Sequence, residues 1–238
     1  YNYNDNSDYL LLDDERSQIP DNFIKNMNLF LKSFSYVSAS RIGPQRYYQS
    51  SYYDIKENNQ VGIKGELFAD YLAIRAEIEE EKIANNFIMH ENTKSEKLIE
   101  QVNAWLSEIS PGITLTSKID NETGIVSLQY VFSSEQYSPI NVGFGLSYVA
   151  PIVVALLKAK KDDLVIIENP EAHLHPRGQR KIGELISRAA AGGVQVIVET
   201  HSDHLLNGIR LSVKEKKINR NITRLNYFYR EEKEDKTF

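Results

Sequence analysis

Apolar positions in the second half of the chain follow two different periodicities. Short, mostly apolar runs lie within 163–168 and 194–199, and stretches with helical spacing lie around them. Short apolar strands that alternate with helices are typical of a parallel sheet covered on both faces. This part of the chain is therefore predicted to be an α/β fold. The helices expected around the two strands cover 145–161, 177–191 and 203–213.

The first half has a different pattern, with amphipathic helices and one hairpin. A helix is predicted from Pro20, with Phe23, Met27, Phe30 and Phe34 at helical spacing, and a strand at 35–40. Residues 41–62 are polar and are predicted to form an irregular connection. Further helices are indicated by two apolar stripes, one of Leu67, Tyr71, Ile74 and Ile78 within 65–84, the other of Leu98, Val102, Trp105 and Ile109. The segments ITLTSKI and GIVSLQYVF flank DNET and predict a hairpin, and ITRLNYFYR near the end predicts an edge strand.

Composition narrows the class of protein. The 238 residues are 41% hydrophobic and 26% charged, which suits a globular protein with a core. There is no cysteine, so disulfides and thiolate metal sites are excluded. The net charge of −5 argues against a wholly basic nucleic-acid binder. No apolar run is long enough for a membrane helix, and the N-terminus lacks the features of a signal peptide, so we expect a cytoplasmic location without membrane contact.

Acids and histidines follow both predicted strands. The run LVIIENPEAHLHP ends its apolar part at Glu168, and VQVIVETHSDHLL stops at Glu199 and His201. Ligands of open α/β sheets bind outside the carboxyl ends of the strands. An apolar strand that ends in a carboxylate is the Walker B arrangement, in which the acid holds Mg²⁺ beside nucleotide phosphates. The two strand ends therefore predict one shared site.

The complete strings resemble a known group of proteins. These strings are SASRIGP at 38–44, VGIKGE at 61–66, VNAWLSEI at 102–109, NVGFGLSYVAPIVVALL at 141–157, ENPEAHLHPRGQ at 168–179 and ETHSDHLLNGIRLSVK at 199–214. They are similar to the ABC-type branch of the AAA and P-loop ATPases, which is related to the OLD, RecF and SMC ATPases. Within it they most resemble a family with a C-terminal domain of unknown function. The resemblance implies an ABC-ATPase-like half with a parallel sheet plus a helical and hairpin insertion.

The resemblance also implies roles for single residues. Glu168 takes the Walker B position and holds Mg²⁺, and His201 takes the H-switch position near the γ-phosphate of ATP. Residues 172–175, which include His173 and His175, match the D-loop at the dimer interface. Gly143, Gly145 and Ser147 lie in the segment that matches the signature motif, where a helix N-terminus faces a γ-phosphate. Arg41 follows a strand and is a candidate phosphate contact, with a solvated turn residue as the alternative.

Three departures from the ABC pattern change the expectations. The phosphate-cradle pattern GxxxxGK[ST] is absent, so we expect it N-terminal to residue 1 and this chain to be the C-terminal part of a longer protein. Asn169 stands where most relatives have the glutamate that polarises the attacking water. Glu171 is the predicted substitute, and hydrolysis is expected to be slow. GFGLS also lacks the usual Ser-Gly-Gly, so the contact to the second subunit is expected from backbone groups and Ser147.

The expected organisation has three parts. Residues 1–35 lead from the phosphate-cradle region, 36–140 hold a strand, the helical insertion and the hairpin, and 141–238 form the ATPase lobe. The resemblance implies a homodimer through ATP-binding heads, with ATP and Mg²⁺ between them, acting in DNA transactions or anti-phage defence. A nuclease or other effector is expected as a partner, and DNA is a further candidate.

Two other functions stay open at this point. THSDH resembles the metal motif of metallo-β-lactamase-type hydrolases, which predicts a site of His201, Asp203 and His204 with His173 and His175. The first histidine of that motif is replaced by Glu199. The second alternative is a module that binds nucleotide without hydrolysing it.

Overall fold

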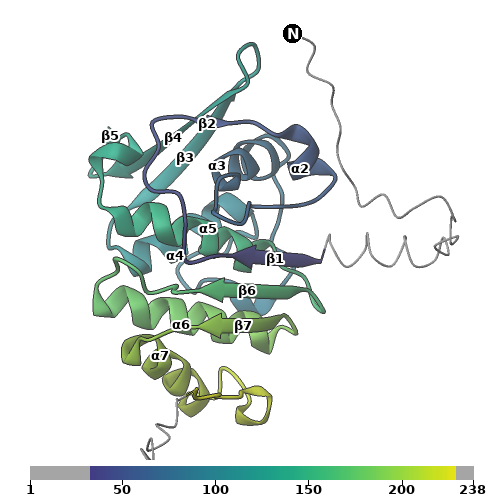
Figure 1. Ribbon diagram of the computed structural model, residues 1–238, viewed down its shortest axis with the longest axis vertical. Helices are drawn as coiled ribbons and strands as arrows, with labels where there is room; N and C mark the ends of the chain where they lie inside the picture. Colours follow the sequence, from purple (N-terminus) through teal and green to yellow (C-terminus); the bar gives the residue numbers. More distant parts are fainter. Residues whose placement is uncertain (1–32, 229–238) are drawn as a thin grey trace, which may run out of the picture.

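The computed structural model describes residues 33–228 and has two sheets around a shared helical core (Figure 1). Strands β1 (Phe34–Val37), β6 (Leu164–Glu168) and β7 (Gln195–Glu199) form a parallel sheet in the order β1-β6-β7. Strands β2 (Tyr48–Gln49), β4 (Ile125–Phe132) and β3 (Thr114–Asp120) form an antiparallel sheet, and β5 (Glu135–Tyr137) pairs with β4. The fold is therefore α/β, as predicted, with an antiparallel addition.

The helices follow the predicted order closely in the second half. The described helices are α2 (Tyr52–Lys56), α3 (Phe68–Tyr71), the π-helix Leu72–Ile78, α4 (Leu98–Ile109), α5 (Phe144–Lys158), α6 (Pro176–Ala191), α7 (Asp203–Lys214), and the 3₁₀ turns Asn86–Ile88, Pro139–Asn141 and Arg220–Ile222. The hairpin is confirmed as β3 and β4. The helix predicted from Pro20 lies outside the described residues.

Three local predictions need correction. The segment 41–62 is not wholly irregular, because it contains β2 and α2. The helix expected over 65–84 ends at Ile78, which is exposed, because the chain turns away after one π-helical stretch. No strand forms over 222–228, the described part of the predicted edge strand. The side chains of Leu225, Tyr227 and Phe228 are largely exposed there. Pairing in a sheet at this place would therefore have to bury them against a neighbouring strand, and the structure has none there among residues 33–228.

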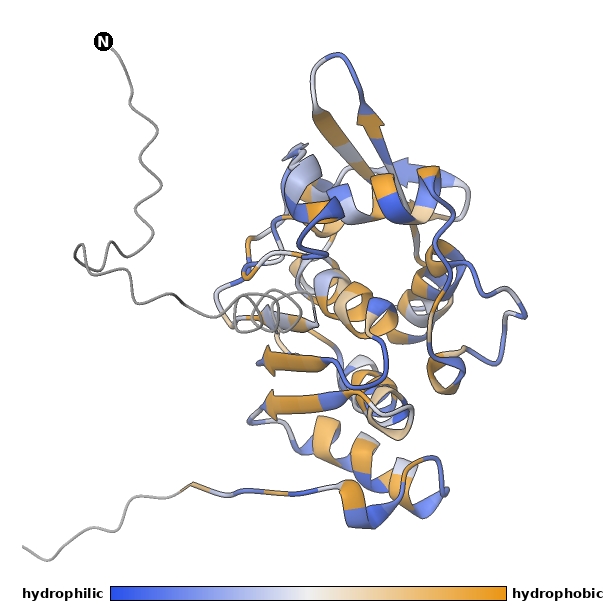
Figure 2. Cartoon of the chain, turned by 90° about the vertical axis from the view of Figure 1, so that its right-hand side faces the viewer, coloured by the Kyte–Doolittle hydropathy of each residue, from blue (hydrophilic) through white to orange (hydrophobic). Residues whose placement is uncertain are grey.

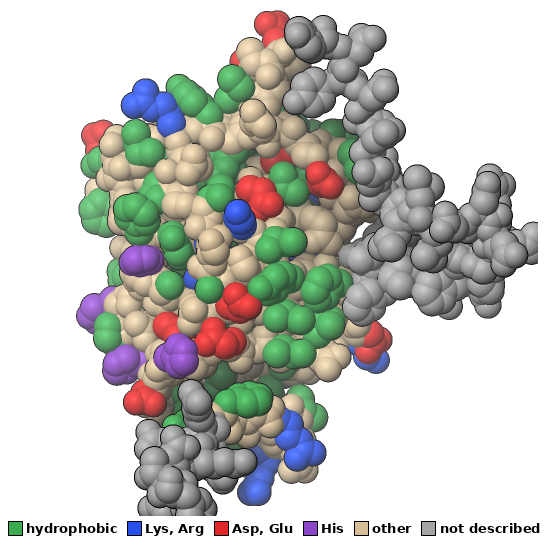
Figure 3. All heavy atoms as spheres, in the orientation of Figure 1, with side chains coloured by type: hydrophobic (Ala, Val, Ile, Leu, Met, Phe, Trp, Pro, Cys, Tyr) green, Lys and Arg blue, Asp and Glu red, His purple; other side chains and the backbone are tan. Residues whose placement is uncertain are grey.

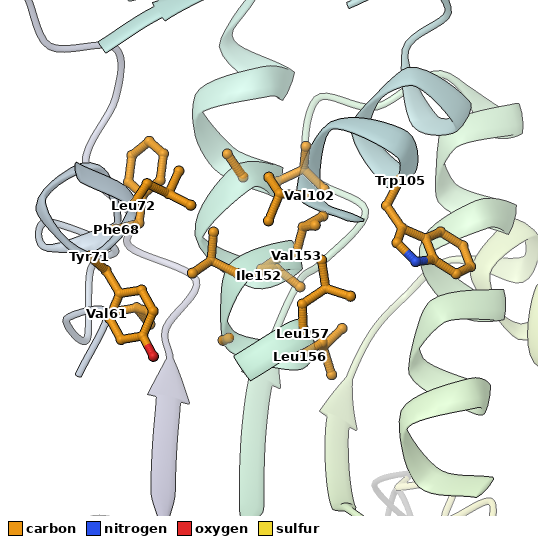
Figure 4. Close-up of a cluster of buried hydrophobic side chains, with 14 of the residues drawn as sticks. Val61, Phe68, Tyr71, Leu72, Val102, Trp105, Ile152, Val153, Leu156 and Leu157 are labelled. Atoms are coloured by element: carbon orange, nitrogen blue, oxygen red, sulfur yellow. The ribbon is translucent and has the colours of Figure 1, made fainter. Parts of the chain in front are cut away.

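The hydrophobic core surrounds α5. Nearly every residue of this helix from Gly145 onward is buried, which explains why its sequence is apolar all round rather than amphipathic. Figure 4 shows Ile152, Val153, Leu156 and Leu157 of α5 between side chains of α3 and α4. The surrounding core holds α5 in place. In turn, α5 packs against β1, β6 and the loop after β6, which carry the candidate site.

The parallel sheet is covered on one face only within residues 33–228. Helices α5 and α6 contact the strands from one side, where Val165 and Ile167 are buried. The other face carries Ile197, which is 49% exposed. Figure 3 shows apolar side chains over this side of the sheet, and Figure 2 shows its strands coloured as hydrophobic. The expectation that helices cover both faces is therefore wrong for the described residues, because α7 packs mainly against α6 and not on the open face of the sheet. None of the described helices is long and apolar enough to cross a membrane.

Candidate nucleotide site

The site is built on the carboxyl ends of two neighbouring strands. β6 and β7 pair in parallel, and their last residues, Glu168 and Glu199, are partners in the register. Adjacent strands lie about 4.8 Å apart, so the two glutamates begin side by side at one edge of the sheet. The loop after each strand adds the remaining polar groups, namely Asn169, Glu171 and His201. The sequence-based expectation of one shared edge is met in the structure.

The Glu168 carboxylate accepts hydrogen bonds from β1 and from the residues just after it. The Tyr36 hydroxyl donates to Oε1 at 2.8 Å, and the Ala39 backbone N–H donates to Oε2 at 2.8 Å. The Ala39 N–H, the Tyr36 hydroxyl and the nearby Arg41 charge all favour the carboxylate and lower the pKa of Glu168. The acid is therefore ionised and oriented before any ligand arrives. Each oxygen keeps lone pairs free, so the group suits a hard cation.

Arg41 braces the ends of β1 and β6. Its side chain is buried, at 4% exposure, and one terminal nitrogen donates to the carbonyls of Ser38 at 2.9 Å and Glu168 at 2.7 Å. The other terminal nitrogen donates to the Asn169 carbonyl at 2.7 Å. The guanidinium therefore points to backbone oxygens and not outward to a phosphate. This corrects the interpretation of Arg41 as a cofactor contact: three carbonyls at the strand ends need donors, and Arg41 supplies them.

The loop after β6 has a strained backbone at two positions. Asn169 has φ of 43° and His173 has φ of 60°, both in the left-handed region that few side chains tolerate. Asparagine is among the residues that adopt it most readily, which gives a local reason for an amide at position 169. The Asn169 N–H donates to the Glu199 carbonyl at 3.0 Å and approaches the Glu199 Oε2 at 3.3 Å.

Glu171 joins the two loops of the site. The Thr200 hydroxyl donates to its Oε2 at 2.7 Å, and the His201 N–H donates to its Oε1 at 3.0 Å. Thr200 also accepts from the Ser202 N–H at 3.0 Å. Both oxygens of Glu171 thus accept bonds from the segment after β7, and the carboxylate sets the path of that segment.

Glu199 and His201 form an exposed pair. Glu199 Oε1 lies 3.2 Å from His201 Nε2, and the two side chains are 50% and 87% exposed. Neither group is engaged by the core, so both are accessible to a ligand. The sequence marks Glu199 as the end of a strand, but its pattern does not single it out as a site residue. Its signal was its position, which is the same relative to β7 as that of Glu168 relative to β6.

The signature-like segment forms the start of α5, with Gly143 as the N-cap. Gly143 is open, since a Cβ there would meet nothing within 4 Å, whereas a Cβ on Gly145 would lie 2.5 Å from the His173 carbonyl oxygen. Gly145 thus permits close packing of α5 on the loop after β6. Ser147 is 2% exposed, so the expectation of a contact from its side chain to a second subunit is wrong: one turn into α5 the helix is already inside the core.

The two histidines of the segment 172–175 lie at the surface. The His173 ring packs against Phe144 at 5.8 Å and Tyr148 at 4.9 Å between ring centroids, which links the loop to α5. His175 is the N-cap of α6, and its Nδ1 accepts from the Arg177 N–H at 3.3 Å. Both side chains thus have a packing or capping role and remain exposed.

The residues present fit Mg²⁺ better than a transition metal. Across residues 33–228, which include all five histidines, no three His, Asp or Glu side chains gather closely enough to hold a metal ion by themselves. Mg²⁺ takes one or two carboxylates and fills its other positions with water and phosphate oxygens. Glu168 provides such an oriented carboxylate, and Glu199 lies one strand away. The hydrolase alternative lacks the gathered histidines that it requires.

The family comparison decides the class. A family model described as "AAA domain, putative AbiEii toxin, Type IV TA system" matches residues 21–207, which is more than half of the chain. The chain belongs to this family of AAA domains. It is therefore a P-loop-type, nucleotide-binding ATPase domain, and the polar edge of β6 and β7 lies within the matched region. A search of curated proteins gave no match.

Solved structures similar to this AAA domain include heads of SMC proteins. An SMC head bound to the C-terminal winged-helix domain of ScpA is 14% identical with a TM-score of 0.39, over 47% of this chain and 36% of that one. An SMC head with an extended coiled coil, bound to the C-terminal domain of ScpA derived from Pyrococcus furiosus, has the same identity and score over 47% and 29%. A chain from work on ATP-driven dimerization and DNA-stimulated activation of SMC ATPases is 16% identical, with a TM-score of 0.40 over 47% and 71%. The AAA domain spans only about a third of the first two chains, and the assignment rests on the family match alone.

Proposed function

We propose that this chain is the Walker B, D-loop and H-switch part of an ABC-type ATPase whose two heads close on ATP and Mg²⁺. Glu168 holds the Mg²⁺, and His201 contacts the γ-phosphate. The phosphate cradle comes from sequence outside these 238 residues, because GxxxxGK[ST] does not occur in them.

The observation that carries the proposal is the register of Glu168 with Glu199 at one sheet edge, with His201 beside them. A rigid sheet presents these groups to solvent, while Tyr36 and Ala39 keep the first acid ionised and oriented. Preorganised charge of this kind is what binding of a metal–phosphate complex requires. The amide at Asn169 cannot act as the base at the usual position, so hydrolysis is expected to be slower than with a glutamate there.

The shared site explains the exposed start of α5. Gly143 is open, and the α5 N-terminus lies on the same side of the fold as the loop after β6, where Phe144 packs against His173. Such a terminus favours a phosphate. In the proposed homodimer, this segment of one head and the His201 edge of the other contact the same γ-phosphate. The engine acts in DNA transactions or anti-phage defence through a nuclease or other effector, and the family description, which names the AbiEii toxin, supports a defence role.

The test is the mass of the full-length protein in sedimentation with Mg-ATP, with Mg-ADP and without nucleotide. ATP is expected to produce a dimer and ADP is not, because a ligand that binds only the closed form stabilises it by mass action. Glu168→Gln should lower steady-state hydrolysis by about 100-fold, roughly 2.7 kcal/mol of barrier. Glu122→Gln is the matched control, since Glu122 is exposed in the β3–β4 turn. A mass independent of nucleotide, together with unchanged hydrolysis in Glu168→Gln, would falsify the proposal.

A further inference from the structure

Hydrolysis of ATP at this site needs a group that accepts a proton from the attacking water. The residue directly after the Walker B acid is Asn169, whose amide cannot take a proton at neutral pH. Besides the proposed metal ligand Glu168, Glu171 and Glu199 are the carboxylates of the described residues that make contacts with the His201 segment. Their surroundings differ, and that difference distinguishes their roles.

The Glu171 carboxylate is engaged in hydrogen bonds within the protein. Its two oxygens accept bonds from the Thr200 hydroxyl at 2.7 Å and the His201 N–H at 3.0 Å. Both oxygens are therefore already used as acceptors within the protein and fix the carboxylate against the segment after β7. A proton on Glu171 would also disrupt the contacts that place the His201 loop. These features describe a positioning residue.

Glu199 has the features of an accessible base. Its side chain is 50% exposed, and its Cα is the register partner of Glu168, which places it next to the acid that orients the metal. One oxygen lies 3.2 Å from His201 Nε2, and the other accepts, among residues 33–228, from the Asn169 N–H at 3.3 Å, which is the longer of the two contacts of that N–H. The Glu199 carboxylate therefore lies between Asn169, which cannot act as a base, and His201, the predicted γ-phosphate contact.

We propose that Glu199 is the catalytic carboxylate that polarises the attacking water, and that Glu171 positions the His201 loop; this rests on the proposed ATPase function. Glu199 accepts a proton as the water oxygen bonds to the γ-phosphorus. The bond from that phosphorus to the bridging oxygen breaks, and its electron pair leaves with ADP. His201, across the 3.2 Å contact, orients the carboxylate during this step.

The experiment compares Glu199→Gln, Glu171→Gln and the control Glu122→Gln in the full-length protein. Each variant is measured for affinity for a fluorescent ATP analogue, steady-state hydrolysis, and the lifetime of the ATP-dependent dimer. Glu199→Gln should keep ATP affinity within about threefold and lose about 100-fold or more in kcat, the usual range for a general base. Its ATP-dependent dimer should persist longer in proportion. Glu171→Gln should change KM and kcat together by less than about tenfold, because the amide still offers one acceptor.

Glu199→Asp separates chemistry from folding. The shorter carboxylate keeps the base but withdraws it by one methylene, so its rate is expected between those of wild type and Glu199→Gln. Full hydrolysis by Glu199→Gln beside an active wild type overturns this assignment alone, as does a 100-fold loss in Glu171→Gln at unchanged ATP affinity. A wild-type protein that binds no ATP overturns the proposed function and this assignment together.

Discussion

Glu168 and Glu199 occupy equivalent positions on neighbouring strands but have opposite surroundings. β6 is the central strand, so Glu168 has β1 beside it, and Tyr36 and Ala39 each donate a bond to its carboxylate. β7 is an edge strand among residues 33–228, so Glu199 has no second neighbour and reaches only the loops around His201 and Asn169. The position in the sheet, and not the local sequence, separates a fixed ligand from an accessible base.

The largest loss of unfolding free energy is expected from Arg41→Met, which removes the hydrogen bonds that join the ends of β1 and β6 on the Glu168 side. The carbonyls of Ser38, Glu168 and Asn169 lose their charged donor within a buried region. The expected loss of unfolding free energy is about 3 kcal/mol, since unsatisfied buried acceptors cost about 1–3 kcal/mol each and some regain water. Chemical denaturation measures it. The exposed Arg46→Met is the control, and equal stability of the two variants would show that Arg41 braces nothing.

A smaller effect is expected from Tyr36→Phe, which makes Glu168 more like Glu199. The hydroxyl that helps to lower the pKa of Glu168 is lost, so that pKa should rise toward its ordinary value. The stability from a carboxyl of lowered pKa is present above its unfolded pKa, near 4.3, and is lost as the pH falls through the folded pKa. The variant should be slightly less stable at neutral pH and show less of this acid-dependent loss below about pH 4.

Denaturation curves from pH 3 to 7 test this prediction. Tyr47→Phe serves as the control because Tyr47 is exposed and lies outside the β1–β6 contact. Identical pH dependence in Tyr36→Phe and wild type would mean that the hydroxyl does not influence Glu168.

The smallest effect on stability is expected from His201→Ala, on the Glu199 side. The imidazole is 87% exposed, so the unfolding free energy should change by no more than about 0.5 kcal/mol. ATP-dependent association of the full-length protein should nevertheless weaken clearly, because a γ-phosphate contact is lost. His204→Ala is the control, because His204 is the exposed second residue of α7. A large loss of stability without a change in association would assign His201 a structural role instead.

Elements with a strong local period could be predicted well from the sequence. The stripe of Leu98, Val102, Trp105 and Ile109 is buried in α4, and the two apolar runs are β6 and β7. The hairpin was also indicated, because its turn and the two flanking segments carry their own signals. The strand predicted over 222–228 does not form, because alternating apolar residues form a strand only where a neighbouring strand pairs with them.

The sequence by itself determined that strands would end in acids and that these ends would meet, because parallel strands place their carboxyl ends at one edge. Only the tertiary structure decided what each polar group does there. In the folded chain, Arg41 donates to three backbone carbonyls and Ser147 is buried in the core around α5. Both oxygens of Glu171 accept hydrogen bonds, whereas Glu199 remains accessible. The physical reason is that periodicity depends on neighbours along the chain, whereas hydrogen bonding and burial depend on groups that come from distant strands. Glu168 meets Ala39 across 129 residues of sequence, and no local pattern records that contact.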